Sequence, residues 1–315
     1  MATVAAVATE ATPQAERLGY DPRLFSGAIA AGGTLGIMIP PSINLIVYGF
    51  LTETSIPRLF LAGLVPGLLL ALAFMAAAAL ICWLRPALGG PSRGASWSRR
   101  LRGLADLLPV AALFLGVVGS IYAGWATPTE AAAVGVALAL VIAALNRTLG
   151  LSMLLDALRG AVRVTAVIML VVVGAYVLNF ALSAAGVGRA LQEFVDGLGL
   201  GPTGTLFAIV ALYVVLGFFI ETLSLMVATI PIIVPIVTGL GHDPVWFGIL
   251  MILLVEMALI TPPVGLNLYV VQGARSSGSL VEVMVGALPF VLVMLGMAFA
   301  LIAAPGLALW LPSAL

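Results

Sequence analysis

Hydrophobic residues occur in long runs along this chain, and short polar links separate the runs. A helix needs about 20 apolar residues to cross the core of a bilayer, and most of the runs reach that length. Uninterrupted helices are expected at 59–84, 105–123, 127–147 and 281–311. Two further runs, 24–51 and 204–238, carry proline or polar residues in their middle. The pattern predicts an all-α polytopic membrane protein in which some spans are broken.

One stretch of the chain occurs twice without a gap, at residues 19–50 and again at 241–272. The two copies align at a constant offset of 222 residues. The residues that this offset pairs as identical are Gly19 with Gly241, Asp21 with Asp243, Pro22 with Pro244, Phe25 with Phe247, and Pro40-Pro41 with Pro262-Pro263. So many matches of glycine, proline and aspartate in one register indicate an internal repeat.

Each copy carries two successive prolines inside its apolar run. Proline removes a backbone donor and clashes with the preceding turn, so each helix must break at its pair. Backbone groups that are freed at membrane depth are tolerated only where they line a cavity or are buried against protein. Paired broken helices in the two halves of an apolar chain indicate the binding site of a secondary transporter.

Composition narrows the class of protein further. The chain is 63% hydrophobic and 8% charged, and its mean hydropathy of +1.23 lies outside the range of soluble domains. The formal net charge is zero and every basic residue is arginine, which argues against a nucleic-acid partner. Cys82 and His242 are the only residues of their types, so a disulfide framework and a histidine-based zinc site are excluded.

The polar links predict which ends of the helices lie on which side of the membrane. The link 85–103 is cytoplasmic by the positive-inside rule. It carries five arginines, Arg85, Arg93, Arg99, Arg100 and Arg102. The link 124–130 ends in Thr127, Pro128 and Glu130, a pattern typical of a helix start. Counting crossings places Asp21 inside and Asp243 outside, so the two copies are expected to be inverted. Both aspartates are interpreted as turn formers before proline.

The middle of the chain is harder to divide into spans. Residues 148–160 are expected to form a short amphipathic segment at the inner surface. The region 161–197 is too short for two full spans and is interpreted as a re-entrant helical hairpin, with its tip near Asn179 and Ser183. The run 204–238 that follows is expected to break in its middle.

Residues 1–18 do not read as a signal peptide, because they lack a basic start and a long apolar core. The repeat register places Met1 opposite Leu223, so the first copy begins partway through an element that is complete in the second. From this register we expect an upstream half-repeat to be missing from the polypeptide.

Four motifs, in order along the chain, carry a resemblance to a known family. They are GGTLGIMIPPS at 32–42, ATPTEAAAVG at 126–135, GFFIETLS at 217–224 and ITPPVGLN at 260–267. The chain resembles the large, DctM-like permease subunit of the tripartite ATP-independent periplasmic (TRAP) transporters. The resemblance implies a sodium-coupled importer of organic anions in the bacterial inner membrane, C4-dicarboxylates or related carboxylates among them. It also implies two partners, a periplasmic substrate-binding protein and a small four-helix membrane subunit, and an elevator movement within the bilayer. Family members carry a further N-terminal hairpin and a Ser-rich motif that this sequence lacks.

Broken helices supply what a sodium ion and a carboxylate need, because freed carbonyls and hydroxyls suit the cation and free N–H groups suit the anion. The candidate site residues of the first half are Gly33, Thr34, Gly36, Pro40, Pro41 and Ser42. Those of the second half are Asn179, Ser183, Gly217, Glu221, Thr222, Ser224, Glu256, Thr261, Pro262 and Pro263. Sodium, the expected coupling ion, is placed near Glu221, Thr222, Thr261 and the carbonyls of Gly33–Gly36. No covalently bound cofactor is expected.

Two carboxylates within the apolar runs are weighed separately, because a charge at membrane depth is costly and is functional by default. Glu221 lies beside an expected helix break, and ion coupling is favoured there as strongly as a structural role. For Glu256 the alternative is a carboxylate that neighbouring N–H groups cap, holding the broken helix together.

The sequence is interpreted as one integral membrane domain over 1–315, embedded in the lipid bilayer. Within it we expect the remainder of the first repeat at 1–58, scaffold helices at 59–160, the second repeat at 161–273 and a C-terminal helix at 274–315. Two alternatives from other classes stay open. One is a membrane-embedded hydrolase or prenyl-transfer enzyme, for which no catalytic constellation is visible, and the other is an inactive or assembly-only fragment.

Overall fold

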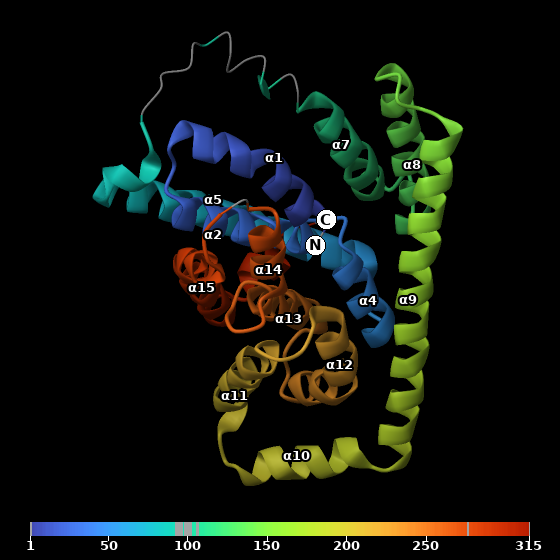
Figure 1. The fold of residues 1–315 in the computed structure, drawn as a ribbon. Coiled ribbons are helices and arrows are strands. Elements are labelled where there is room, and N and C mark those ends of the chain that lie inside the picture. The colour runs from blue at the N-terminus through green and yellow to red at the C-terminus, as the bar shows by residue number, and fades with distance from the viewer. Residues whose placement is uncertain (1, 92–96, 98–102, 105–106, 276, 315) are drawn as a thin grey trace. The chain divides into compact units, whose positions relative to one another are not determined.

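The computed structural model describes residues 2–91, 97, 103–104, 107–275 and 277–314. These residues form helices and turns, with no strand among them. The chain divides into two compact units, Met1–Ser92 with Ala175–Leu315, and Arg93–Gly174 (Figure 1). Each unit is described by itself.

The larger unit contains both copies of the repeat. Its first helices are α1 (Ala2–Leu18), α2 (Pro22–Gly32), α3 (Leu35–Met38), α4 (Ile43–Thr52), α5 (Ile56–Leu84) and the 3₁₀ turn η1 (Pro86–Gly89). Its later helices are α10 (Val187–Gly197), α11 (Gly201–Gly217), α12 (Thr222–Gly239), α13 (Pro244–Ala258), α14 (Leu266–Gly273), α15 (Leu280–Ala303) and α16 (Gly306–Ala314). The smaller unit contains α7 (Leu108–Tyr122), α8 (Pro128–Leu145) and the first part of α9 (Leu151–Ala184).

Within the described residues, five helices are long and apolar enough to cross a membrane. A sixth span is formed if Pro22–Met38 and Ile43–Thr52 are counted as one span with a 42° bend. The predicted all-α polytopic membrane fold is therefore confirmed.

Helix α13 forms the core of the larger unit. Every residue from Val245 to Met257 is buried, as expected for a helix that is apolar on all sides. It packs against α4, α5, α11, α12 and α15, and Figure 1 shows it in the middle of this group. The second copy of the repeat thus forms the centre around which the larger unit packs.

Helices α2 and α15 cross at glycines. A Cβ atom on Gly27 would overlap the backbone of Gly286, and one on Gly286 would overlap the backbone of Arg23. The absence of side chains at both positions lets the two backbones touch. This crossing fixes the first copy of the repeat against the C-terminal part of the chain.

The two copies begin with the same local structure. Asp21 accepts hydrogen bonds from the backbone N–H groups of the two residues that follow Pro22, and Asp243 does the same after Pro244. The preceding turns have a glycine in the left-handed region, Gly19 with φ 74° and Gly241 with φ 88°. The prediction that both aspartates form turns before proline is confirmed.

The predicted breaks are also present. In the first copy α3 ends at Met38 and α4 starts at Ile43, and in the second copy residues 259–265 separate α13 from α14. The run 204–238 is interrupted at 218–221, between α11 and α12. At the start of α8, Thr127 and Glu130 form a reciprocal capping box, as their spacing predicts.

Two expectations are wrong. Residues 151–184 form the single helix α9, not a short segment followed by a hairpin, so Asn179 lies inside a helix. Ser183 is the residue before the end of α9, next to the turn at 185–186 that leads into α10. The range contains no proline, and the chain turns only at Gly186, which has a φ of 69°. The expected helix 281–311 is two helices, because Ala304, the residue before Pro305, leaves the helical conformation with φ −136° and ψ 77°.

The arginine-rich link is described only in part, and its cytoplasmic location stays a prediction. Arg85 ends α5, whereas Arg93, Arg99, Arg100 and Arg102 lie outside the described residues.

Candidate functional site

The first helix break consists of two steps. Thr34 is fully buried between α2 and α3, and its hydroxyl donates to the carbonyl of Ala31 at 2.9 Å. Pro40 and Pro41 separate α3 from α4, and Ser42 starts α4 by accepting from the N–H of Leu45 at 3.4 Å. The bond between the two prolines is cis. The hydroxyls predicted for this break are therefore inside the protein and bound to local backbone.

The glycines of the first break differ in what they contact. A Cβ atom on Gly33 would overlap the side chain of Val4, whereas Gly36 has open space around it. Gly33 therefore allows the close approach of α1 to this break. Gly36 is exposed and leaves the backbone of α3 accessible.

The second break repeats the arrangement in the other copy. The hydroxyl of Thr261 donates to the carbonyl of Met257, and the backbone N–H of Asn267 donates to the carbonyl of Leu259 at 3.0 Å. Pro262 and Pro263, joined by a cis bond, lie between these contacts. The chain therefore leaves α13, loops through the prolines and returns beside the end of the same helix.

Polar contacts join the two copies directly. The side-chain amide of Asn267 donates to the carbonyl of Ala30, near the end of α2, at 3.2 Å. The hydroxyl of Tyr48 on α4 donates to the carbonyl of Pro244 at 2.7 Å, and its ring covers Gly248. Both side chains are buried. Asn267 and Tyr48 were not among the predicted site residues, although an amide four residues after a Pro-Pro pair is a usable signal in the sequence.

The third break lies beside the second. A Cβ atom on Gly217, the last residue of α11, would lie 2.6 Å from the Cβ atom of Ala258, the last residue of α13. The ends of α11 and α13 therefore meet where both chains leave their helices. In this way the packing brings Gly217 and the break 218–221 to the Thr261 region.

Glu221 caps α12. One of its carboxylate oxygens accepts from the backbone N–H of Ser224 at 3.0 Å and from its hydroxyl at 3.2 Å. The other accepts from the hydroxyl of Thr222 at 3.1 Å. All three predicted residues of this break thus form one hydrogen-bonded group.

Glu256 is in the opposite situation. Its side chain is fully buried, and neither carboxylate oxygen has a hydrogen-bond partner among the described residues. The interpretation of Glu256 as a carboxylate capped by N–H groups is therefore wrong, and Glu221 is the carboxylate that has this role. The buried Oδ1 atom of Asn267 also lacks a partner within the described part of the chain.

Asn179 lies at a different place. It lines a cavity of about 230 Å³ with the end of α4 and with Pro231 and Pro235 of α12. The structure therefore does not bring Asn179 to the three breaks. The side chain of Ser183 lies outside the described part.

Apolar spans that three helix breaks interrupt are typical of a multi-pass membrane protein of the transporter type. Comparison with known proteins identifies the family. The family model of the tripartite ATP-independent periplasmic transporter, DctM component, matches residues 1–307, so this chain belongs to that family. It is a transporter permease component and not an enzyme.

The relatives differ in the substrates for which they are named. The C4-dicarboxylate TRAP transporter large permease protein DctM of Pseudomonas aeruginosa is 35% identical over 315 residues, which are 99% of this chain and 73% of that protein. The ectoine/5-hydroxyectoine permease UehC of Ruegeria pomeroyi is 32% identical, over 98% of this chain and 72% of the relative. The sialic acid permease SiaM of Vibrio cholerae is 35% identical, over 80% of this chain and 59% of the relative.

Proposed function

We propose that this protein is the membrane permease of a sodium-coupled, binding-protein-dependent importer of organic anions in the bacterial inner membrane. The observation that carries the proposal is the joining of helix breaks inside the larger unit, through the Asn267–Ala30 hydrogen bond and the Gly217–Ala258 contact. Broken helices at the interface of two repeats are the usual substrate and ion site of secondary transporters.

The side chains at the second break fit a sodium ion. Sodium is a hard cation that oxygen ligands suit. The hydroxyl of Thr261 donates its hydrogen bond to the carbonyl of Met257, so the lone pairs of the hydroxyl oxygen remain available to a cation. Glu256 and the Oδ1 atom of Asn267 are buried acceptors to which no described residue donates, and a cation would offset the cost of burying them. The carboxylate of Glu221 is already engaged by N–H and hydroxyl donors, so it stabilises the helix start beside the ion.

The start of α14 fits the anion. No described side chain caps this helix, whose N-cap is Gly265. The backbone N–H groups of Gly265, Asn267 and Leu268 already donate to backbone carbonyls, so a carboxylate would be attracted here by the positive end of the helix dipole. The substrate class is therefore a small carboxylate, which includes the C4-dicarboxylates named for one relative.

In the proposed mechanism the two copies are inverted in the membrane and the broken helices move as a group against the scaffold. The substrate arrives on a periplasmic binding protein, and the small four-helix membrane subunit supports the permease. The opposite predicted locations of Asp21 and Asp243 support the inversion.

Uptake into membrane vesicles tests the proposal. The chain is co-expressed with the small subunit and supplied with its binding protein, loaded with the ligand that raises the melting temperature of that protein. Uptake is expected to require an inward sodium gradient. Thr261→Ala should reduce this uptake at least tenfold, because it removes an oxygen ligand of the ion.

The matched control is Thr238→Ala. The hydroxyl of Thr238 donates to the carbonyl four residues earlier at 3.0 Å, as Thr261 does, but the residue is exposed near the end of α12. Its loss should leave uptake unchanged. Uptake that is equally fast without sodium would contradict sodium coupling, and an equal effect of both substitutions would contradict the assignment of Thr261.

A further inference from the structure

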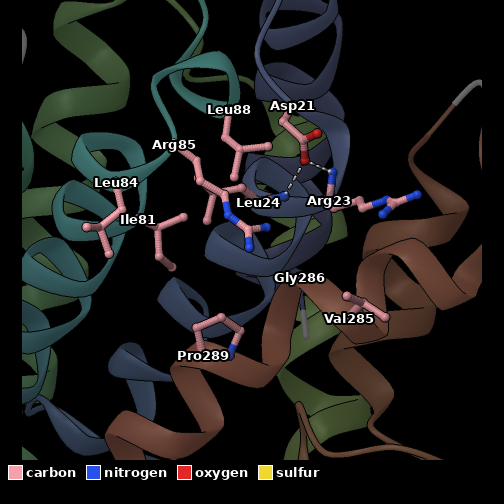
Figure 2. Close-up of a pocket in the computed structure, with 10 residues that line it drawn as sticks. All are labelled: Asp21, Arg23, Leu24, Ile81, Leu84, Arg85, Leu88, Val285, Gly286 and Pro289. Atoms are coloured by element: carbon pink, nitrogen blue, oxygen red, sulfur yellow. Dashed lines mark hydrogen bonds between the residues drawn. The ribbon is translucent and has the colours of Figure 1, made fainter.

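A cavity of about 330 Å³ lies where three helices of the larger unit meet. The N-terminal end of α2, the C-terminal end of α5 with η1, and the N-terminal part of α15 surround it (Figure 2). The backbone N–H of Asp21 donates to the carbonyl of Leu88 at 3.2 Å and closes one side. The cavity is distant in sequence from the helix breaks, and none of the candidate transport residues lines it.

Two arginines line this cavity, and neither makes a side-chain hydrogen bond or ion pair with any residue that the structure describes. Figure 2 shows the side chain of Arg85 extending into the cavity, whereas that of Arg23 extends away along the rim. The one carboxylate of the lining, Asp21, is engaged by the N–H groups of Arg23 and Leu24 at 2.9 and 3.0 Å. Glu282 is paired with Arg275 at 2.7 Å. Two guanidinium groups and one carboxylate leave the lining with a net positive charge, and Arg85 contributes most of it because Glu282 also attracts Arg23.

The rest of the wall is apolar. Ile81, Leu84 and Leu88 contribute one side, and Val285 and Pro289 contribute the other. Leu84 is 64% exposed and the adjacent Trp83 is 76% exposed. At the end of a spanning helix, large apolar side chains with that exposure suit contact with lipid, and this agrees with a cavity that opens toward the bilayer.

The position of the cavity matches the boundary of the membrane. The spanning segment of α5 ends at Leu84, and Arg85 is the next residue. Trp83 is of the type that gathers at the level of the lipid headgroups. By the positive-inside rule this is the cytoplasmic boundary, where anionic lipids attract arginine.

We propose that this cavity binds an anionic phospholipid of the surrounding membrane. The lipid phosphate lies against the guanidinium of Arg85, with Arg23 adding positive charge at the rim. The first part of an acyl chain covers Ile81, Leu84 and Val285. A soluble phosphate would satisfy the arginine but would leave the apolar wall in water, so the combination of charge and apolar surface selects a lipid. The bound lipid joins α5 to α2 and α15 at one membrane face.

Lipid retention by the purified full chain tests this proposal. The protein is stripped of lipid in detergent, then exposed separately to phosphatidylglycerol and phosphatidylcholine, and the bound lipid is counted by native mass spectrometry. Phosphatidylglycerol should bind in preference. Arg85→Gln should reduce that preference about fivefold, the value expected for one arginine near a membrane surface.

The matched control is Arg17→Gln, which removes the same charge from the end of α1, an exposed position that does not line the cavity. It should leave the preference unchanged. A second variant, Val285→Trp, keeps both arginines and fills the apolar side, and it should also weaken retention of phosphatidylglycerol. Variants are compared only when they elute as single species.

Three outcomes would overturn the proposal. The first is a phosphatidylglycerol preference that survives Arg85→Gln. The second is an equal loss in Arg17→Gln, which would indicate general attraction to a basic surface. The third is displacement of the lipid by inorganic phosphate together with no effect of Val285→Trp, which would indicate a site for a soluble anion.

Discussion

At the scale of single residues, two carboxylates in similar sequence surroundings have different environments. Glu221 is satisfied by donors of its own helix start, including the N–H of Ser224 at 3.0 Å. Glu256 is enclosed by the core and meets no donor among the described residues. A carboxylate buried without a partner is costly, which is why we propose Glu256 as a ligand of the cation and assign Glu221 to the stability of the break.

Glycines allow the helices of this fold to approach each other closely. The substitution Gly286→Ala tests this at the crossing of α2 and α15. The added methyl group would overlap the backbone of Arg23, so the helices must separate. We expect a loss of about 1–3 kcal/mol in the free energy of unfolding, typical of overpacking, measured by denaturation in detergent.

Gly296→Ala on the same helix is the control, because no atom lies within 4 Å of the added methyl group. It brings the same gain in helix propensity, about 1 kcal/mol, without the overlap. Equal stability of the two variants would mean that the crossing is looser than described.

At the scale of elements, the breaks are the feature that separates this protein from a simple bundle. The first break combines two prolines, which end a helix, with a polar start for the next helix, at Pro40, Pro41 and Ser42. The second break has the proline pair with Gly265 as the next N-cap, and the third has no proline but a polar N-cap, Glu221. The neighbouring helix α5 contains Pro66 and yet continues through it. One proline is thus tolerated within a span, whereas a pair interrupts it.

Replacing Pro40 and Pro41 together by alanine should restore a helical path between α3 and α4. Alanine is favoured over proline inside a helix by about 3 kcal/mol per residue. We expect the variant to insert into the membrane at the normal level but to lose sodium-dependent uptake in vesicles. Pro66→Ala should retain uptake, and wild-type uptake by the double variant would show that the break is not required.

At the scale of the whole molecule, the repeat predicts opposite orientations for its two copies. Glu16 and Thr238 occupy equivalent positions at the offset of 222 residues, and both are exposed near helix ends. If the copies are inverted, the two positions face opposite sides of the membrane.

Cysteine labelling in cells measures this orientation. In a background of Cys82→Ser, Thr238→Cys should react with a membrane-impermeant maleimide added outside. Glu16→Cys should react only after the membrane is permeabilised. Labelling of both positions from the same side would contradict the inversion.

The sequence by itself determined the local features of this protein. It predicted the apolar spans, the breaks at Pro-Pro, the aspartates as turn formers before proline and the Thr127–Glu130 helix start, because each depends on residues within one or two turns. It failed where local signals were weak, at the unbroken helix α9 and at Ala304 before Pro305.

Only the tertiary structure decided which distant residues meet. The contacts of Gly217 with Ala258 and of Asn267 with Ala30 join segments that are far apart in the chain. The same packing left Glu256 without a donor among the described residues and placed Arg85 and Val285 around one cavity. Such contacts depend on how helices cross, and a crossing depends on the shapes of both surfaces together, which neither segment encodes alone.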